Sequence, residues 1–136
     1  MIKFTILGCG SSMGVPRADG NWGKCDPNET KNFRTRCSAI IQTKKRNILI
    51  DTSPDLRFQL IKNKIENVDT VLYSHMHGDQ VHGINDLRIF ALKNANKIPV
   101  YADKLTKKYL LKNFLYCFKD SRDYRAILSI NDLKKN

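Results

Sequence analysis

Alternating apolar and polar side chains predict short strands along the chain. Residues 2–7 alternate, and residues 37–43 and 47–51 predict two further strands joined by a basic turn. A run at residues 69–73 predicts a fourth strand. Two later strands are expected at residues 98–102 and 126–130, and Pro99 favours a sheet edge for the first of these because proline cannot donate to a ladder.

Apolar residues at helical spacing lie between these strands. Ser53 is the expected N-cap of a helix that begins at Pro54. A second helix is expected over residues 85–94 and a third from about Asp103. The expected apolar faces are Leu56, Leu60 and Ile61 in the first helix, Ile84, Leu87, Phe90 and Ala91 in the second, and Leu105, Tyr109, Leu110 and Phe114 in the third. Strands and helices alternate only in part, which predicts an α/β fold with a mixed sheet.

A glycine- and serine-rich turn at residues 8–14 leads into a long polar loop at residues 16–36. A loop of this length in a compact domain is usually functional or mobile. The four cysteines are Cys9, Cys25, Cys37 and Cys117, and no two form a Cys-x-x-Cys pair. Reduced thiols in the cytoplasm are therefore expected. A small metal site made by the first three cysteines is the alternative.

The composition is that of one globular domain with a basic surface. The 136 residues are 41% hydrophobic and 27% charged, with a formal net charge of +11. This charge favours anionic partners such as phosphate esters, nucleotides, nucleic acid or acidic protein. A solvated lysine-rich face is the simpler explanation, since the lysines are scattered. No apolar run reaches the length of a membrane span.

The most informative stretch is residues 75–82, His-Met-His-Gly-Asp-Gln-Val-His, which holds all three histidines of the chain. In an extended segment, His75, His77 and Asp79 would point to the same side. Two imidazoles and a carboxylate suit a borderline cation such as Zn²⁺. The alternative is a polar loop whose imidazoles face solvent.

Several motifs together resemble a known family. His-Met-His-Gly-Asp-Gln at residues 75–80 is similar to the His-x-His-x-Asp-His motif of the metallo-β-lactamase fold. Further similarities, to the phosphodiesterase-like branch of that fold, lie at residues 8–17, 32–38, 49–57 and 83–88, so that essentially the whole chain is covered in order. That branch includes enzymes that cleave cyclic phosphodiesters, and its wider relatives include ribonuclease Z.

The resemblance implies a fold and a set of roles. The expected fold is the N-terminal half of a metallo-β-lactamase-like αββα sandwich, with residues 1–136 as a single partial domain. His75 and His77 would hold a first metal, and Asp79 would hold a second and orient the attacking water as the catalytic residue. Asp51 and His82 would not bind the metal themselves but would hold the ligand side chains in place. Zinc is the expected metal, with manganese or iron as alternatives, in one or two ions.

The resemblance also implies contacts with a phosphate. Arg17, Arg34, Arg36 and Arg88 would bind it through charge-assisted hydrogen bonds. For each arginine taken separately, a role in surface solubility is the alternative.

Two departures from the family pattern change the expectation. Gln80 stands where the motif has histidine, and an amide oxygen is a poor zinc ligand, so the second metal should bind weakly or not at all. The family's later ligands come from a second half, and no histidine follows His82 here. The expected partner is therefore a second copy or a separately encoded C-terminal half.

Three functions remain open from the sequence. The first is a cytoplasmic metal-dependent phosphodiester hydrolase acting on a phosphate ester or nucleotide. The second is a non-catalytic remnant or subunit. The third is a basic RNA-binding module. A membrane partner is not expected.

Overall fold

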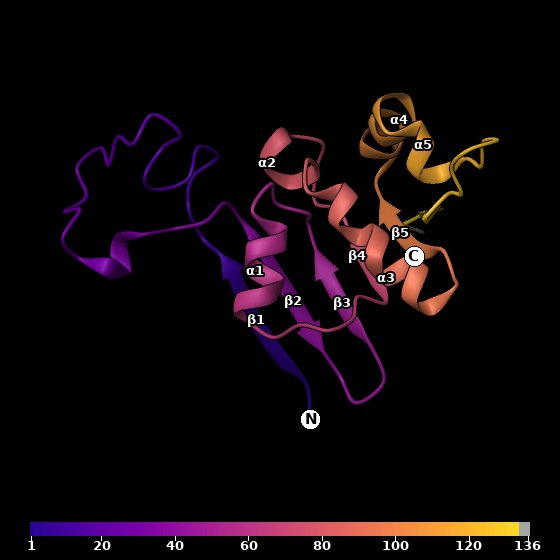
Figure 1. Cartoon of the computed structure of the whole chain (residues 1–136), viewed down its shortest axis with the longest axis horizontal. Coiled ribbons are helices and arrows are strands. Elements are labelled where there is room, and N and C mark those ends of the chain that lie inside the picture. Colours follow the sequence, from indigo (N-terminus) through magenta and orange to yellow (C-terminus); the bar gives the residue numbers. More distant parts are fainter. Residues whose placement is uncertain (134–136) are drawn as a thin grey trace.

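A six-stranded mixed sheet forms the frame of the computed structural model, which describes residues 1–133 (Figure 1). Its strands are β1 Lys3–Gly8, β2 Ser38–Gln42, β3 Asn47–Ile50, β4 Thr70–Leu72, β5 Ile98–Ala102 and β6 Leu128–Asp132. They lie side by side in chain order. The β1–β2 and β2–β3 pairs are antiparallel, whereas the pairs from β3 to β6 are parallel. The α/β class and the mixed sheet are confirmed.

Short helices connect the strands. They are η1 Thr30–Asn32, α1 Leu56–Lys62, α2 Gly78–Val81, η2 Ile84–Leu87, α3 Arg88–Asn94, α4 Lys104–Asn113 and α5 Leu115–Phe118. The expected long loop between β1 and β2 is present and contains only the single turn η1 (Figure 1). Over residues 1–133, no helix has the length and apolar character that crossing a membrane requires.

The core lies on one face of the sheet. Ile40, Leu49, Val71 and Val100 are neighbours in register across β2 to β5, and each is fully buried. The buried residues of α1, η2 and α3 belong to the same core: Leu56, Leu60, Ile84, Leu87, Phe90 and Ala91. Each fully buried large side chain contributes about 1.5–3 kcal/mol relative to an exposed one. This layer fixes the strand ends from which the candidate site is built.

The opposite face of the sheet, here called the open face, is apolar and uncovered in the described residues. Successive side chains along a strand point to opposite faces, so the register defines this face. It consists of Phe4 and Ile6 on β1, Ala39 and Ile41 on β2, Ile48 and Ile50 on β3, Leu72 on β4 and Tyr101 on β5. Phe4 and Ile6 are 59% and 63% exposed, and the others are half-buried.

Two expectations about local structure were wrong. β5 lies between β4 and β6 and is not an edge strand. The sheet tolerates Pro99 there because the ladder with β4 pairs only Val100 and Tyr101. The first helix begins at Leu56 rather than Pro54, because the Ser53 hydroxyl accepts a hydrogen bond from the Asp55 N–H in a turn that precedes the helix.

The apolar faces of the helices were predicted well, with two exceptions. Ile61 and Leu105 are 64% and 66% exposed. The start of α4 is confirmed, since the carboxylate of Asp103 accepts a hydrogen bond from the Thr106 N–H at 2.7 Å and caps the helix.

Candidate metal centre

Two histidine side chains meet directly after β4. His75 and His77 lie in the segment between β4 and α2, and both are exposed. His75 Nε2 and His77 Nδ1 are 3.1 Å apart, with ring centroids 4.6 Å apart and ring planes at 78°. Two nitrogens bound to one tetrahedral zinc ion, each at about 2.0–2.1 Å, would be about 3.3 Å apart. The pair therefore fits two ligand positions of a borderline cation.

Asp51 orients this histidine pair through Ser74. One carboxylate oxygen of Asp51 accepts from the Ser74 N–H at 2.8 Å, and the other accepts from the Ser74 hydroxyl at 2.7 Å. The Ser74 oxygen lies 3.0 Å from His75 Nδ1. Because the hydroxyl donates its hydrogen to Asp51, it accepts from His75 Nδ1–H, which leaves the lone pair of Nε2 facing His77. This relay fixes a tautomer suited to binding a metal.

Asp51 is itself an unusual residue. It is buried, and its φ of 60° lies in the left-handed region, which costs of order 1–3 kcal/mol for a residue other than glycine. Burial raises the pKa of its carboxyl group, while the two hydrogen bonds from Ser74 act in the opposite direction. Strain and burial at one carboxylate are typical of a functional position.

Asp79 and Gln80 lie in α2, so the extended geometry expected for Asp79 was wrong. Gln80 Nε2 donates to Asp79 Oδ2 at 2.8 Å. Gln80 is buried, and among residues 1–133 its Oε1 has no hydrogen-bond partner. An unsatisfied buried acceptor costs about 1–3 kcal/mol. Within residues 1–133, no three His, Cys, Asp or Glu side chains are grouped as a metal site. The structure thus brings the two histidine rings together, whereas the Asp79 carboxylate is hydrogen-bonded to Gln80.

His82 follows α2 and contacts different neighbours. Its ring packs edge-to-face on Phe114, with centroids 6.0 Å apart, and lies against Gly78. The ring is exposed. It therefore supports the connection between α2 and the end of α4.

The four candidate arginines are not gathered into one cluster. Arg34 donates to the backbone carbonyl of Lys31 within the long loop, and the guanidinium of Arg88 lies 4.8 Å from the ring centroid of Tyr124. Arg17 is exposed in the same loop. Arg36 is the one whose pKa is raised by the charge of Asp79, after the stronger effect of its hydrogen bonds to Asp55. Of the four, Arg36 has the best-supported place beside the candidate site.

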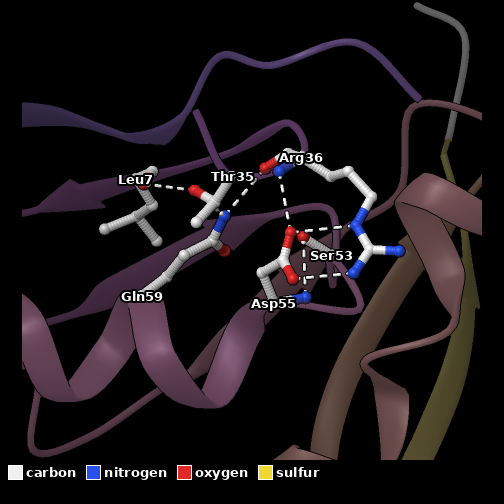
Figure 2. A network of polar contacts seen from close by, with 6 residues as sticks. All are labelled: Leu7, Thr35, Arg36, Ser53, Asp55 and Gln59. Carbon is white, nitrogen blue, oxygen red and sulfur yellow. Dashed lines mark hydrogen bonds and ion pairs between the residues drawn. The ribbon is translucent and has the colours of Figure 1, made fainter. Parts of the chain in front are cut away.

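A polar network that the sequence did not reveal anchors Arg36 to α1 (Figure 2). The Asp55 carboxylate accepts from the Arg36 backbone N–H at 2.8 Å, from Nε at 2.9 Å and from Nη2 at 2.7 Å. These hydrogen bonds hold the pKa of Asp55 below its ordinary value. Gln59 Nε2 donates to the Arg36 carbonyl at 2.7 Å and to Thr35 Oγ1 at 3.0 Å. The network fixes the end of the long loop to the start of α1.

Ser74 was also missed by the sequence analysis. A hydroxyl residue directly before the first histidine was the available signal, since ligand histidines usually donate their second ring N–H to an acceptor. The Asp55–Arg36 pair had no such signal, because 19 residues separate its partners.

Comparisons with known proteins agree on the fold. Residues 46–136 match the family model described as "Beta-lactamase superfamily domain". The chain is 35% identical over 119 residues to an octanoyltransferase of Porphyromonas gingivalis and 27% identical over 100 residues to a ribonuclease Z of Clostridium kluyveri. A crystal structure of a diphosphatase from the PhnP family superposes with a TM-score of 0.80 at 28% identity over 98% of this chain.

The matched regions are parts of longer proteins. The chain spans 24% of the octanoyltransferase, 27% of the ribonuclease Z and 52% of the diphosphatase chain. The family match covers most of this chain and includes β3, β4, the histidine pair and α2. Together with the sheet order and the superposition, it shows that the chain belongs to the beta-lactamase superfamily domain family and has the metallo-β-lactamase fold.

Proposed function

We propose that this chain carries the first metal-binding half of a phosphodiester hydrolase. The observation that supports it most is the histidine pair, with its ligand nitrogens 3.1 Å apart and its tautomer fixed by Asp51 through Ser74. The diphosphatase and the ribonuclease Z, by their names, cleave phosphate linkages, which supports the reaction class.

Each residue has a role that follows from its surroundings. A divalent metal held by His75 and His77 supplies activation of water and neutralisation of a phosphodiester oxygen. Asp79 has one oxygen occupied by Gln80, and its other oxygen is the proposed acceptor for the attacking water. Arg36, held by Asp55 and with a pKa that the charge of Asp79 helps to raise, is the proposed phosphate ligand. Zinc suits the two imidazoles best, and manganese or iron are alternatives.

The substrate class is a phosphate ester or nucleotide, with RNA as the second candidate. The net charge of +11 and the identity to a ribonuclease Z favour an anionic substrate of either kind. Metal content after dialysis, and turnover of bis-para-nitrophenyl phosphate and of a short RNA in the presence of zinc or manganese, test the proposal. Metal binding without turnover would favour a non-catalytic subunit, and RNA binding without metal would favour the basic RNA-binding module.

Replacing Gln80 by histidine should raise the affinity for a second metal. The imidazole would supply a nitrogen ligand and release Asp79 from the amide of Gln80. Elemental mass spectrometry after dialysis in limiting zinc should show a higher metal content than in the wild-type chain. Gln80→Leu, which releases Asp79 without adding a nitrogen, is the control. Equal metal content in all three proteins would show that position 80 does not limit the second site.

The open face supports a proposal about partners. It presents a continuous apolar surface across β1 to β5, and this chain matches only 52% of the diphosphatase chain. We expect a second apolar layer to cover it, either from a polypeptide segment similar to the rest of that diphosphatase or from a second copy of this chain.

As an isolated 136-residue chain, the protein should associate through its open face. Sedimentation velocity at micromolar concentration should show species larger than the monomer, and the double substitution Ile6→Lys with Ile48→Lys should reduce them. Ile89→Lys is the matched control, because Ile89 is 62% exposed on α3, away from the sheet. A wild-type chain that is monomeric and unfolds cooperatively would contradict the prediction.

A further inference from the structure

Two of the four cysteines lie at the base of the long loop, Cys9 where the loop begins and Cys37 where it ends. Gly8 and Ser38 form the last paired position of the β1–β2 ladder, and the next residues outward are Cys9 and Cys37. The two segments stay together beyond that point, where Gly10 and Arg36 form an isolated bridge of the parallel type and the Gly10 N–H donates to the Thr35 carbonyl at 2.7 Å. Cys9 and Cys37 therefore lie between two paired positions that hold the segments close together. A disulfide needs Cα atoms about 4.4–6.8 Å apart.

Both cysteines lie just outside the ladder, Cys9 directly after β1 and Cys37 in a bend directly before β2. The paired positions beside them face the helices, since a Cβ added at Gly8 would overlap the amide of Gln59 on α1 and Ser38 is buried. Both cysteines are exposed, and the Cys37 thiol donates to the Gly10 carbonyl at 3.2 Å.

The charges of the candidate metal centre also act on the Cys37 thiol. The pKa of Cys37 is raised first by its partial burial and then by the charges of Asp79, Cys9 and Asp51. The effect of Cys9 agrees with its place in the neighbouring segment. The geometry connects Cys37 to the candidate site, since the hydroxyl of Ser38, the next residue, donates to the backbone carbonyl of Asp51 at 3.0 Å.

We propose that Cys9 and Cys37 are a thiol pair that a peroxide oxidises to an intramolecular disulfide, closing residues 10–36 into a covalent loop beside the candidate site. The Cys9 sulfur attacks the peroxide, so that the O–O bond breaks, an S–O bond forms and one water leaves. The Cys37 sulfur then attacks the Cys9 sulfur, so that the S–S bond forms, the S–O bond breaks and a second water leaves with the Cys37 proton. The peroxide is reduced, the two thiols are oxidised, and no metal is required.

The other two cysteines provide internal controls. Cys25 is exposed within the long loop and has no counterpart in the β1–β2 ladder, and Cys117 is buried. If exposure alone decided oxidation, Cys25 would react as readily as Cys9. If the ladder decides it, only Cys9 and Cys37 become linked.

Peptide mapping of the full-length chain tests the pair. The chain is treated with an equimolar amount of hydrogen peroxide, its remaining thiols are alkylated, and it is digested with trypsin. The three exposed cysteines then fall in separate peptides, residues 4–17, 25–31 and 37–44. The expected product links residues 4–17 to residues 37–44, with Cys25 alkylated, and dithiothreitol should reverse it.

Two variants make the result decisive. Cys25→Ser should form the same link in the same yield, and Cys9→Ser should form no link at residue 37. A link that contains Cys25, or oxidation of Cys9 to sulfinic or sulfonic acid without a link to Cys37, would overturn the proposal.

Discussion

Replacing His75 or His77 by alanine is expected to lower the metal affinity of the chain at least about 100-fold and to remove turnover of an activated phosphodiester. Each change removes one of the two nitrogens that lie 3.1 Å apart, and the single imidazole that remains does not hold a zinc ion tightly. Both side chains are exposed, so their removal leaves the core intact. A loss of metal binding in these variants would therefore reflect the missing ligand and not unfolding of the chain.

Thermal unfolding provides a second measurement of the same site. Zinc at about 100 times its Kd should stabilise the wild-type chain by about 2.7 kcal/mol, and neither histidine variant should show this gain. Asp51→Asn should weaken binding by a smaller factor, about 10–100-fold, because it removes support for His75 and not a ligand.

His82→Ala is the matched control for these variants. It also removes an exposed histidine, but one whose ring packs on Phe114. Its metal content should equal that of the wild-type chain. If His82→Ala loses the metal and His75→Ala keeps it, the histidine pair is not the site.

Much of the fold followed from the sequence because local pattern and tertiary structure agree. β1 was recognised by its alternation, and β2 to β4 by short apolar runs that polar residues bound. β5 was recognised as a strand but misplaced at an edge. Because proline has no backbone N–H, it removes a ladder hydrogen bond only where the neighbouring strand would accept one at that position. The sequence does not show which positions of two strands are paired.

The candidate site was predicted less completely. The histidines stand out because of their spacing, whereas the direction of Asp79 depends on whether residues 78–81 are extended or helical. Short segments of four residues carry too little periodicity to decide between the two. Contacts between segments far apart in the chain, such as Arg36 with Asp55, require the fold to be known. Zinc, the substrate and a cytoplasmic location stay predictions.

Replacing Gly83 by alanine is expected to destabilise the chain by about 3 kcal/mol or more and to disrupt the candidate site. Gly83 follows α2, and its N–H donates to the Thr52 carbonyl at 2.9 Å, while the Thr52 N–H donates to the Gln80 carbonyl at 2.7 Å. These two hydrogen bonds join α2 to the segment that holds Asp51. A Cβ at position 83 would overlap the carbonyl oxygen of Ser53 and lie 2.8 Å from its carbon. Backbone atoms cannot rotate away, so the two segments must separate.

The melting temperature and the metal content together measure this effect. For a domain of this size, a loss of about 3 kcal/mol lowers Tm by about 10 °C. Gly78→Ala is the matched control, because a Cβ there would meet only the exposed imidazole of His82 at 3.3 Å, which can turn aside. It should change stability by less than about 1 kcal/mol. Equal Tm values for the two variants would mean that the junction between α2 and the Asp51 segment is not close-packed. Metal binding that survives in Gly83→Ala would mean that the histidine pair forms without support from that junction.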